Sequence, residues 1–255
     1  MSAESYFVLV NRDNMTNMDG VDGLLGLGFK ELSDDYNTIV DSLYLGGKIQ
    51  KRVFALYLNH LGEIGNQQGY GNHPSSLQIG GYDLEKYAPD GISATVKVIR
   101  GTGFWYSMIS KFEMSSYKLT NIPVIFDSGT TLIIVDSNSY KNLYNTLRSK
   151  HYCIDYGIII CSCDSKDTMP TLKFNIGNVD FKLNQETAWY YEQGQCVLLV
   201  QGANIDFWIL GSVFLQNFYT VFNMDTLQVT LTSVFEDWGP RGISLVWIVM
   251  ALSSY

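Results

Sequence analysis

Residues 124–135 read VIFDSGTTLIIV, in which a polar pentapeptide stands between two apolar runs. Short continuous apolar runs are typical of buried β-strands, so we expect a strand on each side of the pentapeptide. Asp127 then lies in a loop held by the core and not in an ordinary surface turn. Gly129 permits the tight backbone that brings N–H groups to a carboxylate, and Thr130 adds a hydroxyl donor. The pattern therefore predicts a carboxylate that is oriented and stays ionised.

Outside this stretch, short apolar or alternating runs separated by Gly, Asn and Asp dominate the chain, which is typical of strands. The clearest of these runs are residues 53–58, 172–176, 196–200 and 218–222.

Two stretches favour helices instead. Thr38–Leu45 is followed by Gly46-Gly47, which can adopt a left-handed cap, and Ser139–Ser149 has apolar residues on one helical face. The polar stretch 62–76 is expected to be a loop.

Composition excludes several classes of function. The 255 residues include 17 basic and 25 acidic side chains, giving a formal charge of −8, and 46% are hydrophobic. This balance argues against a disordered chain and against nucleic-acid binding, which needs Lys and Arg opposite phosphates. No signal peptide is visible in residues 1–10. The apolar stretch 243–252 is too short to span a bilayer by itself. It is either a piece of a longer membrane segment or an artefact of where the sequence stops, so a membrane role stays open.

Two further segments place two apolar residues before a glycine. They are Leu24-Leu25-Gly26, which follows Asp22-Gly23, and Ile209-Leu210-Gly211. Over most of residues 6–232, the order and spacing of these motifs resemble those of the pepsin-like aspartic proteases. Residues 53–59, 76–87 and 103–106 are further stretches that are similar to that family. In that family each of two lobes has an Asp-Thr/Ser-Gly loop and, later, an apolar-apolar-Gly segment that packs beside it.

The resemblance implies an all-β, two-lobed fold and hydrolysis of peptide bonds in extended polypeptides by two aspartates that share a water molecule. One carboxylate acts as the base and the other as the acid, so no metal or cofactor is needed. The resemblance implies that Asp127 is catalytic and is supported by Ser128, Gly129 and Thr130. It implies substrate contacts at Thr131, Trp105 and Tyr106. The segment that packs beside the loop is Ile209, Leu210 and Gly211. The full-length protein is expected to be a monomer.

The chain departs from the family in having a single Asp-Ser/Thr-Gly motif. We therefore expect residues 1–94 to be a remnant of the first lobe with part of a connecting sheet, 95–235 a nearly complete second lobe, and 236–255 an extra tail. Three explanations compete: a truncated piece of an active enzyme, which we favour, an inactive relative that keeps a peptide-binding cleft, and a symmetric dimer like the retroviral proteases. Residues 20–90 resemble the end of a first lobe, which a dimer of single lobes does not need.

The four cysteines, Cys153, Cys161, Cys163 and Cys196, form an even set that suggests disulfides and an oxidising compartment. The resemblance implies a Cys163–Cys196 bridge, which leaves Cys153 and Cys161 as a local pair. It also implies a secretory, endolysosomal, vacuolar or extracellular location. A zinc site built from His151 and three of the cysteines is the competing interpretation, although Cys-x-Cys is not the usual zinc-knuckle spacing.

Overall fold

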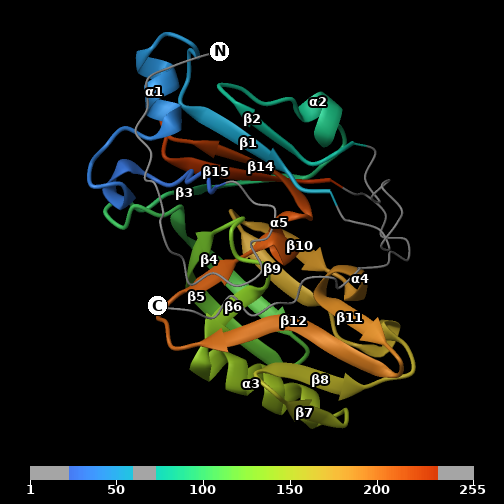
Figure 1. Ribbon diagram of the computed structural model, residues 1–255. Helices are drawn as coiled ribbons and strands as arrows, with labels where there is room; N and C mark the ends of the chain where they lie inside the picture. Colours follow the sequence, from blue (N-terminus) through green and yellow to red (C-terminus); the bar gives the residue numbers. More distant parts are fainter. Residues whose placement is uncertain (1–22, 60–72, 235–255) are drawn as a thin grey trace.

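The computed structural model describes residues 23–59 and 73–234. In that part of the chain, strands form one five-stranded sheet and one ten-stranded sheet, which lie in the upper and lower halves of Figure 1. The expectation of an all-β, two-lobed architecture is confirmed. Asp22 and the apolar stretch 243–252 lie outside the described residues, as does most of the predicted loop 62–76.

The five-stranded sheet joins the two ends of the described chain. Its order is β2-β1-β14-β15-β3, and every neighbouring pair is antiparallel. The strands are β1 (Val53–Tyr57), β2 (Ser76–Ile79), β3 (Ser93–Lys97), β14 (Phe218–Asn223) and β15 (Gln228–Ser233). The 3-10 helix η1 (Lys30–Leu32) and the helices α1 (Ile39–Leu45) and α2 (Leu84–Tyr87) accompany it.

The ten-stranded sheet has the order β10-β9-β4-β5-β13-β6-β12-β8-β7, with β11 paired to β12. Its strands are β4 (Tyr106–Met114), β5 (Tyr117–Phe126), β6 (Ile133–Asp136), β7 (Cys153–Asp155), β8 (Ile158–Ser162), β9 (Leu172–Ile176), β10 (Val179–Leu183), β11 (Trp189–Glu192), β12 (Gln195–Ala203) and β13 (Trp208–Leu210). The helices of this half are α3 (Ser137–Arg148), η2 (Lys166–Thr168), α4 (Gln185–Ala188) and α5 (Ser212–Leu215).

Local sequence accounts for the two longer helices. Thr38 and Asp41 form a reciprocal capping box at the start of α1, and Gly47 after its end has a φ of +65°, where glycine is favoured. Helix α3 starts two residues earlier than expected, because Asp136 accepts the N–H groups of Asn138 and Ser139 as its N-cap.

The domain boundaries expected at residues 94 and 95 fall inside β3. Strands β14 and β15, which we expected to stay with the second lobe, hydrogen-bond to β1 and β3 in the five-stranded sheet. The five-stranded sheet is thus built from both halves of the chain. Periodicity cannot reveal this, because it shows which residues form a strand and not which strand lies beside it.

An aromatic cluster around Trp105, which directly precedes β4, joins residues 27–29 to the five-stranded sheet. The ring of Trp105 lies 4.5 Å from Phe29, 5.5 Å from Phe54 and 5.0 Å from Phe222, measured between ring centroids. Its indole N–H donates to the carbonyl of Leu27 at 2.7 Å. These contacts hold residues 27–29 against the segment that leads into β4.

Both expected disulfides are present, Cys153–Cys161 and Cys163–Cys196. The first joins the antiparallel strands β7 and β8, where the two cysteines are direct register partners. The second joins the segment after β8 to β12. The thiolates that a zinc site needs are therefore consumed by the two bridges.

The two disulfides should differ in their contribution to stability. Their cysteines are 8 and 33 residues apart in sequence, and the entropy lost by the unfolded chain grows with loop length, corresponding to about 2.5 and about 4 kcal/mol. Replacing Cys163 and Cys196 together by Ala should lower the free energy of unfolding by about 1 kcal/mol more than the same change at Cys153 and Cys161. Urea unfolding of the two double variants measures this, and an equal loss would contradict the loop-length explanation.

Candidate active site

The loop that carries Asp127 lies where three strands of the ten-stranded sheet meet. Strand β13 lies between β5, to which it is parallel, and β6, to which it is antiparallel. Leu210 at the end of β13 faces Phe126 at the end of β5 and Ile133 at the start of β6. Because β5 ends there and β6 begins there, residues 127–132 must form a loop at this edge.

The Asp127 carboxylate is oriented by its own loop. Its Oδ1 accepts the backbone N–H of Gly129 at 2.9 Å, and its Oδ2 accepts the hydroxyl of Thr130 at 2.6 Å. Its backbone N–H donates to the Leu210 carbonyl at 3.2 Å. Both donors predicted from the sequence are thus in place. The carboxylate is half-buried, with exposed Ser128 and Gly129 beside it, so one side of the loop stays open to solvent.

Gly211 allows the loop to pack directly against the end of β13. A Cβ atom at this position would lie 2.2 Å from the carbonyl oxygen of Leu132 and 2.4 Å from that of Thr130. The next two N–H groups complete the contact: Ser212 donates to the Thr130 carbonyl at 2.7 Å and Val213 to the Thr131 carbonyl at 2.9 Å. The predicted role of the Ile209-Leu210-Gly211 segment matches this packing.

Two residues outside the predicted set of site residues also hold the site. The Ser212 hydroxyl donates to the Ser128 carbonyl at 3.1 Å, which adds a side-chain contact between α5 and the loop. Asp136, at the far end of β6, accepts the indole N–H of Trp208 at 3.0 Å and so fixes the start of β13. The N-cap pattern at Asp136 was visible in the sequence, but its partner 72 residues away was not.

The predicted substrate contacts differ in their surroundings. Thr131 is exposed beside the loop, and Tyr106 is half-buried with its ring edge-on to Phe207 at 6.4 Å. Trp105 is only 5% exposed, and its side chain belongs to the aromatic core. Its burial counts against a substrate contact through the indole, because hardly any of that surface is free to meet a ligand. Its backbone carbonyl instead accepts the N–H of Phe126, next to Asp127, at 3.2 Å.

The Leu24-Leu25-Gly26 segment is packed quite differently from the Ile209-Leu210-Gly211 segment. Leu24 is 72% and Leu25 56% exposed, whereas Ile209 and Leu210 are buried. A Cβ added at Gly26 would meet no atom within 4 Å, in contrast to Gly211. In the described structure nothing lies against Leu24-Leu25-Gly26 in the way that the Asp127 loop lies against Ile209-Leu210-Gly211.

Other kinds of site find no support in the described ranges. Residues 23–59 and 73–234 contain no group of three or more His, Cys, Asp or Glu side chains placed to hold a metal ion. In the same part of the chain, no helix is long and apolar enough to cross a membrane.

Comparison with known proteins agrees with the fold. Residues 4–234 match the family model for eukaryotic aspartyl proteases. The chain is 30% identical to rhizopuspepsin of Rhizopus chinensis over 84% of its own length and 52% of that protein. It is 29% identical to gastricsin of Oryctolagus cuniculus, covering 82% of this chain and 53% of that one. This chain belongs to the eukaryotic aspartyl protease family, and it spans about half the length of the curated relatives it matches.

We expect the Gly211→Ala substitution to be strongly destabilising. The added methyl group would overlap two backbone carbonyls that cannot rotate away, so the cost should be about 3 kcal/mol or more. Gly81→Ala is the matched control, because a Cβ there meets no atom within 4 Å, and it should change stability by less than about 1 kcal/mol. Chemical unfolding of both variants measures the difference. Equal effects would show that Gly211 is not in close contact with the loop.

The charge of Asp136 should make stability depend on pH. Partial burial acts to raise its pKa, but hydrogen bonds from Ser139, Trp208 and Asn138 outweigh it, and the net result is a pKa below the usual 3.8. A lowered pKa stabilises the fold above the unfolded value, and this contribution is lost as the pH falls through the folded value. Asp136→Asn, which keeps a capping oxygen, should therefore be less stable than the parent protein at neutral pH.

The difference between Asp136→Asn and the parent should shrink below about pH 3.8, because the carboxylate is protonated first in the unfolded state and, at lower pH, in the folded state. Asp136→Ala removes the cap as well and should cost about 1 kcal/mol even at low pH. Urea unfolding across this pH range tests both statements. A constant difference between Asp136→Asn and the parent would contradict a role for the charge.

Proposed function

We propose that this chain is part of an aspartic-type endopeptidase, in which Asp127 supplies one of the two carboxylates that activate a water molecule. Its carboxylate is oriented by two hydrogen bonds from its own loop and is open on one side. Two carboxylates held close together do not both ionise readily, so one serves as base and the other as acid. The base takes a proton from water, and the acid protonates the carbonyl oxygen of the scissile peptide bond.

The observation that carries this proposal is the contrast between the two apolar-apolar-Gly segments. Gly211 is covered by an aspartate loop, while its counterpart Gly26 has open space where a side chain would begin. Leu24 and Leu25 are exposed beside it, although large apolar side chains are usually buried. We infer that a second Asp-Ser/Thr-Gly loop covers this segment in the whole protein. The curated relatives extend over about twice the length matched here, which leaves room for such a segment.

The substrate class and compartment follow from the same proposal. Family members named pepsin and gastricsin are among the relatives, and we propose extended polypeptides as substrates of the whole protein. The two disulfides favour an oxidising compartment, such as a secretory or vacuolar lumen or the extracellular space.

One observation favours a second candidate, a catalytically inactive homologue that binds peptides. The 255 residues contain a single Asp-Ser/Thr-Gly motif, and one carboxylate cannot supply both the acid and the base. The two candidates make different predictions for the protein isolated from its natural source.

The direct test is proteolysis by that natural protein, using an unfolded protein as substrate between about pH 3 and pH 7, the range in which carboxylates change protonation. We expect cleavage, inhibition by a statine-type transition-state mimic, and an intact mass and N-terminal sequence that reveal a second Asp-Ser/Thr-Gly. Asp127→Asn should lower kcat by a factor of about 100 to 10,000 or more, because it removes a proton-transfer group.

Asp90→Asn is the matched control. It makes the same chemical change at an Asp-Gly pair that lacks the intervening Ser or Thr, and it should leave kcat unchanged. Absence of cleavage by the natural protein, together with retained binding of the statine-type ligand, would favour the inactive peptide-binding homologue. Cleavage that survives Asp127→Asn would contradict the assigned role of Asp127.

A further inference from the structure

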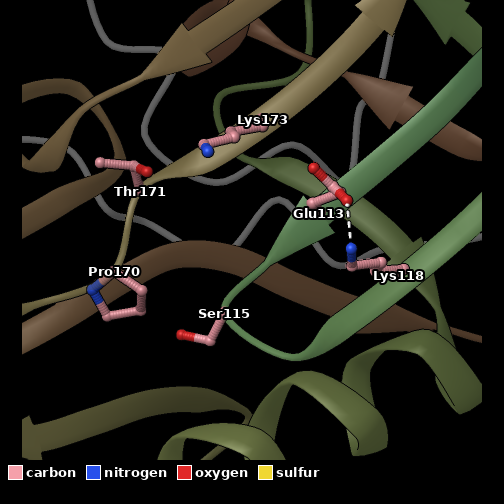
Figure 2. Close-up of a pocket in the computed structure, with 6 residues that line it drawn as sticks. All are labelled: Glu113, Ser115, Lys118, Pro170, Thr171 and Lys173. Carbon is pink, nitrogen blue, oxygen red and sulfur yellow. Dashed lines mark ion pairs between the residues drawn. The ribbon is translucent and has the colours of Figure 1, made fainter.

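A surface pocket of about 360 Å³ lies at the end of the β4–β5 hairpin, far from Asp127. It is lined by Glu113, Ser115, Lys118, Pro170, Thr171 and Lys173. In Figure 2, Lys173 and Thr171 stand on one side of the pocket, and Glu113 and Lys118 on the other. The ten-residue strand β5 separates the hairpin turn from Asp127, a length of about 34 Å, so this pocket is distinct from the candidate active site.

The strand registers place an uneven row of charges on the solvent face of the sheet. Glu113 on β4 is the direct partner of Lys118 on β5 and of Lys173 on β9, and Lys173 is in turn opposite Lys182 on β10. Two like charges directly opposite each other on neighbouring strands destabilise a sheet. The row thus has three ammonium groups, those of Lys118, Lys173 and Lys182, for the one carboxylate of Glu113. The protein as a whole has a formal charge of −8.

The single carboxylate of this row is already engaged. Glu113 Oε1 lies 2.7 Å from the Lys111 ammonium and 2.9 Å from that of Lys118. Hydrogen bonds from these two lysines lower the pKa of Glu113 to about 2, so it stays ionised and keeps both lysines in place. Among the described residues, neither Lys173 nor Lys182 has a carboxylate within the 4.0 Å of an ion pair.

Hydroxyl groups complete the set of donors around Lys173. Ser115, in the two-residue turn between Met114 and Tyr117, and Thr171, just before β9, both line the pocket. The lining thus contains two ammonium and two hydroxyl groups, the kinds of donor that an oxyanion with several acceptor oxygens uses. A volume of about 360 Å³ falls in the range of ligand sites and leaves room for the molecule that bears the anion.

We propose that this pocket binds a phosphate group, with Lys173 as its principal cationic partner and Ser115, Thr171 and Lys118 as further donors. The bound dianion relieves the repulsion between Lys173 and Lys182. The Glu113 carboxylate lies on the opposite side of the pocket, where Lys111 and Lys118 neutralise it. The proposal does not depend on the proposed proteolytic function.

Binding of inorganic phosphate to the full chain at mildly alkaline pH, where the free anion is mostly dianionic and lysine is still protonated, tests this site. Isothermal titration and amide NMR should show saturable binding, with shifts concentrated at Ser115, Thr171 and Lys173. Sodium acetate at the same ionic strength should give no such shifts. O-phosphoserine serves as a second probe: tighter binding than phosphate would identify a phosphate ester as the ligand, and equal binding would identify the free anion.

Lys173→Gln should weaken phosphate binding roughly tenfold, the expected cost of losing a charged hydrogen bond, and Lys173→Arg should restore most of it. Lys141→Gln is the matched control, because it removes the same charge from the exposed face of α3, and it should leave binding unchanged. Thermal unfolding confirms that each variant is folded. Absence of saturable binding, or equal weakening by Lys173→Gln and Lys141→Gln, would overturn the proposal.

Discussion

The close approach of Gly211 to the carbonyls of Thr130 and Leu132 is the contact on which the candidate active site depends. Because no side chain intervenes, the N–H groups of Ser212 and Val213 reach the carbonyls of the aspartate loop. Strands β5 and β6 hold the two ends of the loop. The residues that follow β13 hold it from the side. The Asp127 carboxylate needs only two further donors, and the loop itself supplies them.

The rest of the described chain supports this contact from a distance. Asp136 couples the end of β6 to the start of β13 through Trp208, and it also begins α3, so one carboxylate fixes three elements. The five-stranded sheet brings residues from both ends of the described chain together, and Trp105 packs between that sheet and the segment around Phe29. The open surface at Leu24-Leu25-Gly26 marks the one place where an analogous loop contact is missing in the described structure.

The sequence predicted the local parts of this arrangement well. The apolar flanks of the Asp127 loop, its two carboxylate donors and both helices follow from local chemistry, and the resemblance implied the disulfide pairing that the structure contains. The features that the sequence did not predict are contacts between distant residues. The pairing of β14 with β1 and the bond from Trp208 to Asp136 join residues more than 70 positions apart. The row of charges across β5, β4, β9 and β10 appears only once the registers are known.

The central claim is that Asp127 is one half of a catalytic pair whose other half lies outside the described residues. A crystal structure of the protein from its natural source, in complex with a statine-type transition-state mimic, tests it most directly. The account predicts that the hydroxyl group of the mimic lies within hydrogen-bond distance of Asp127 and of a second aspartate, held in a loop that covers Leu24-Leu25-Gly26. An inhibitor bound without contact to Asp127, or a natural protein in which that segment remains uncovered, would contradict it.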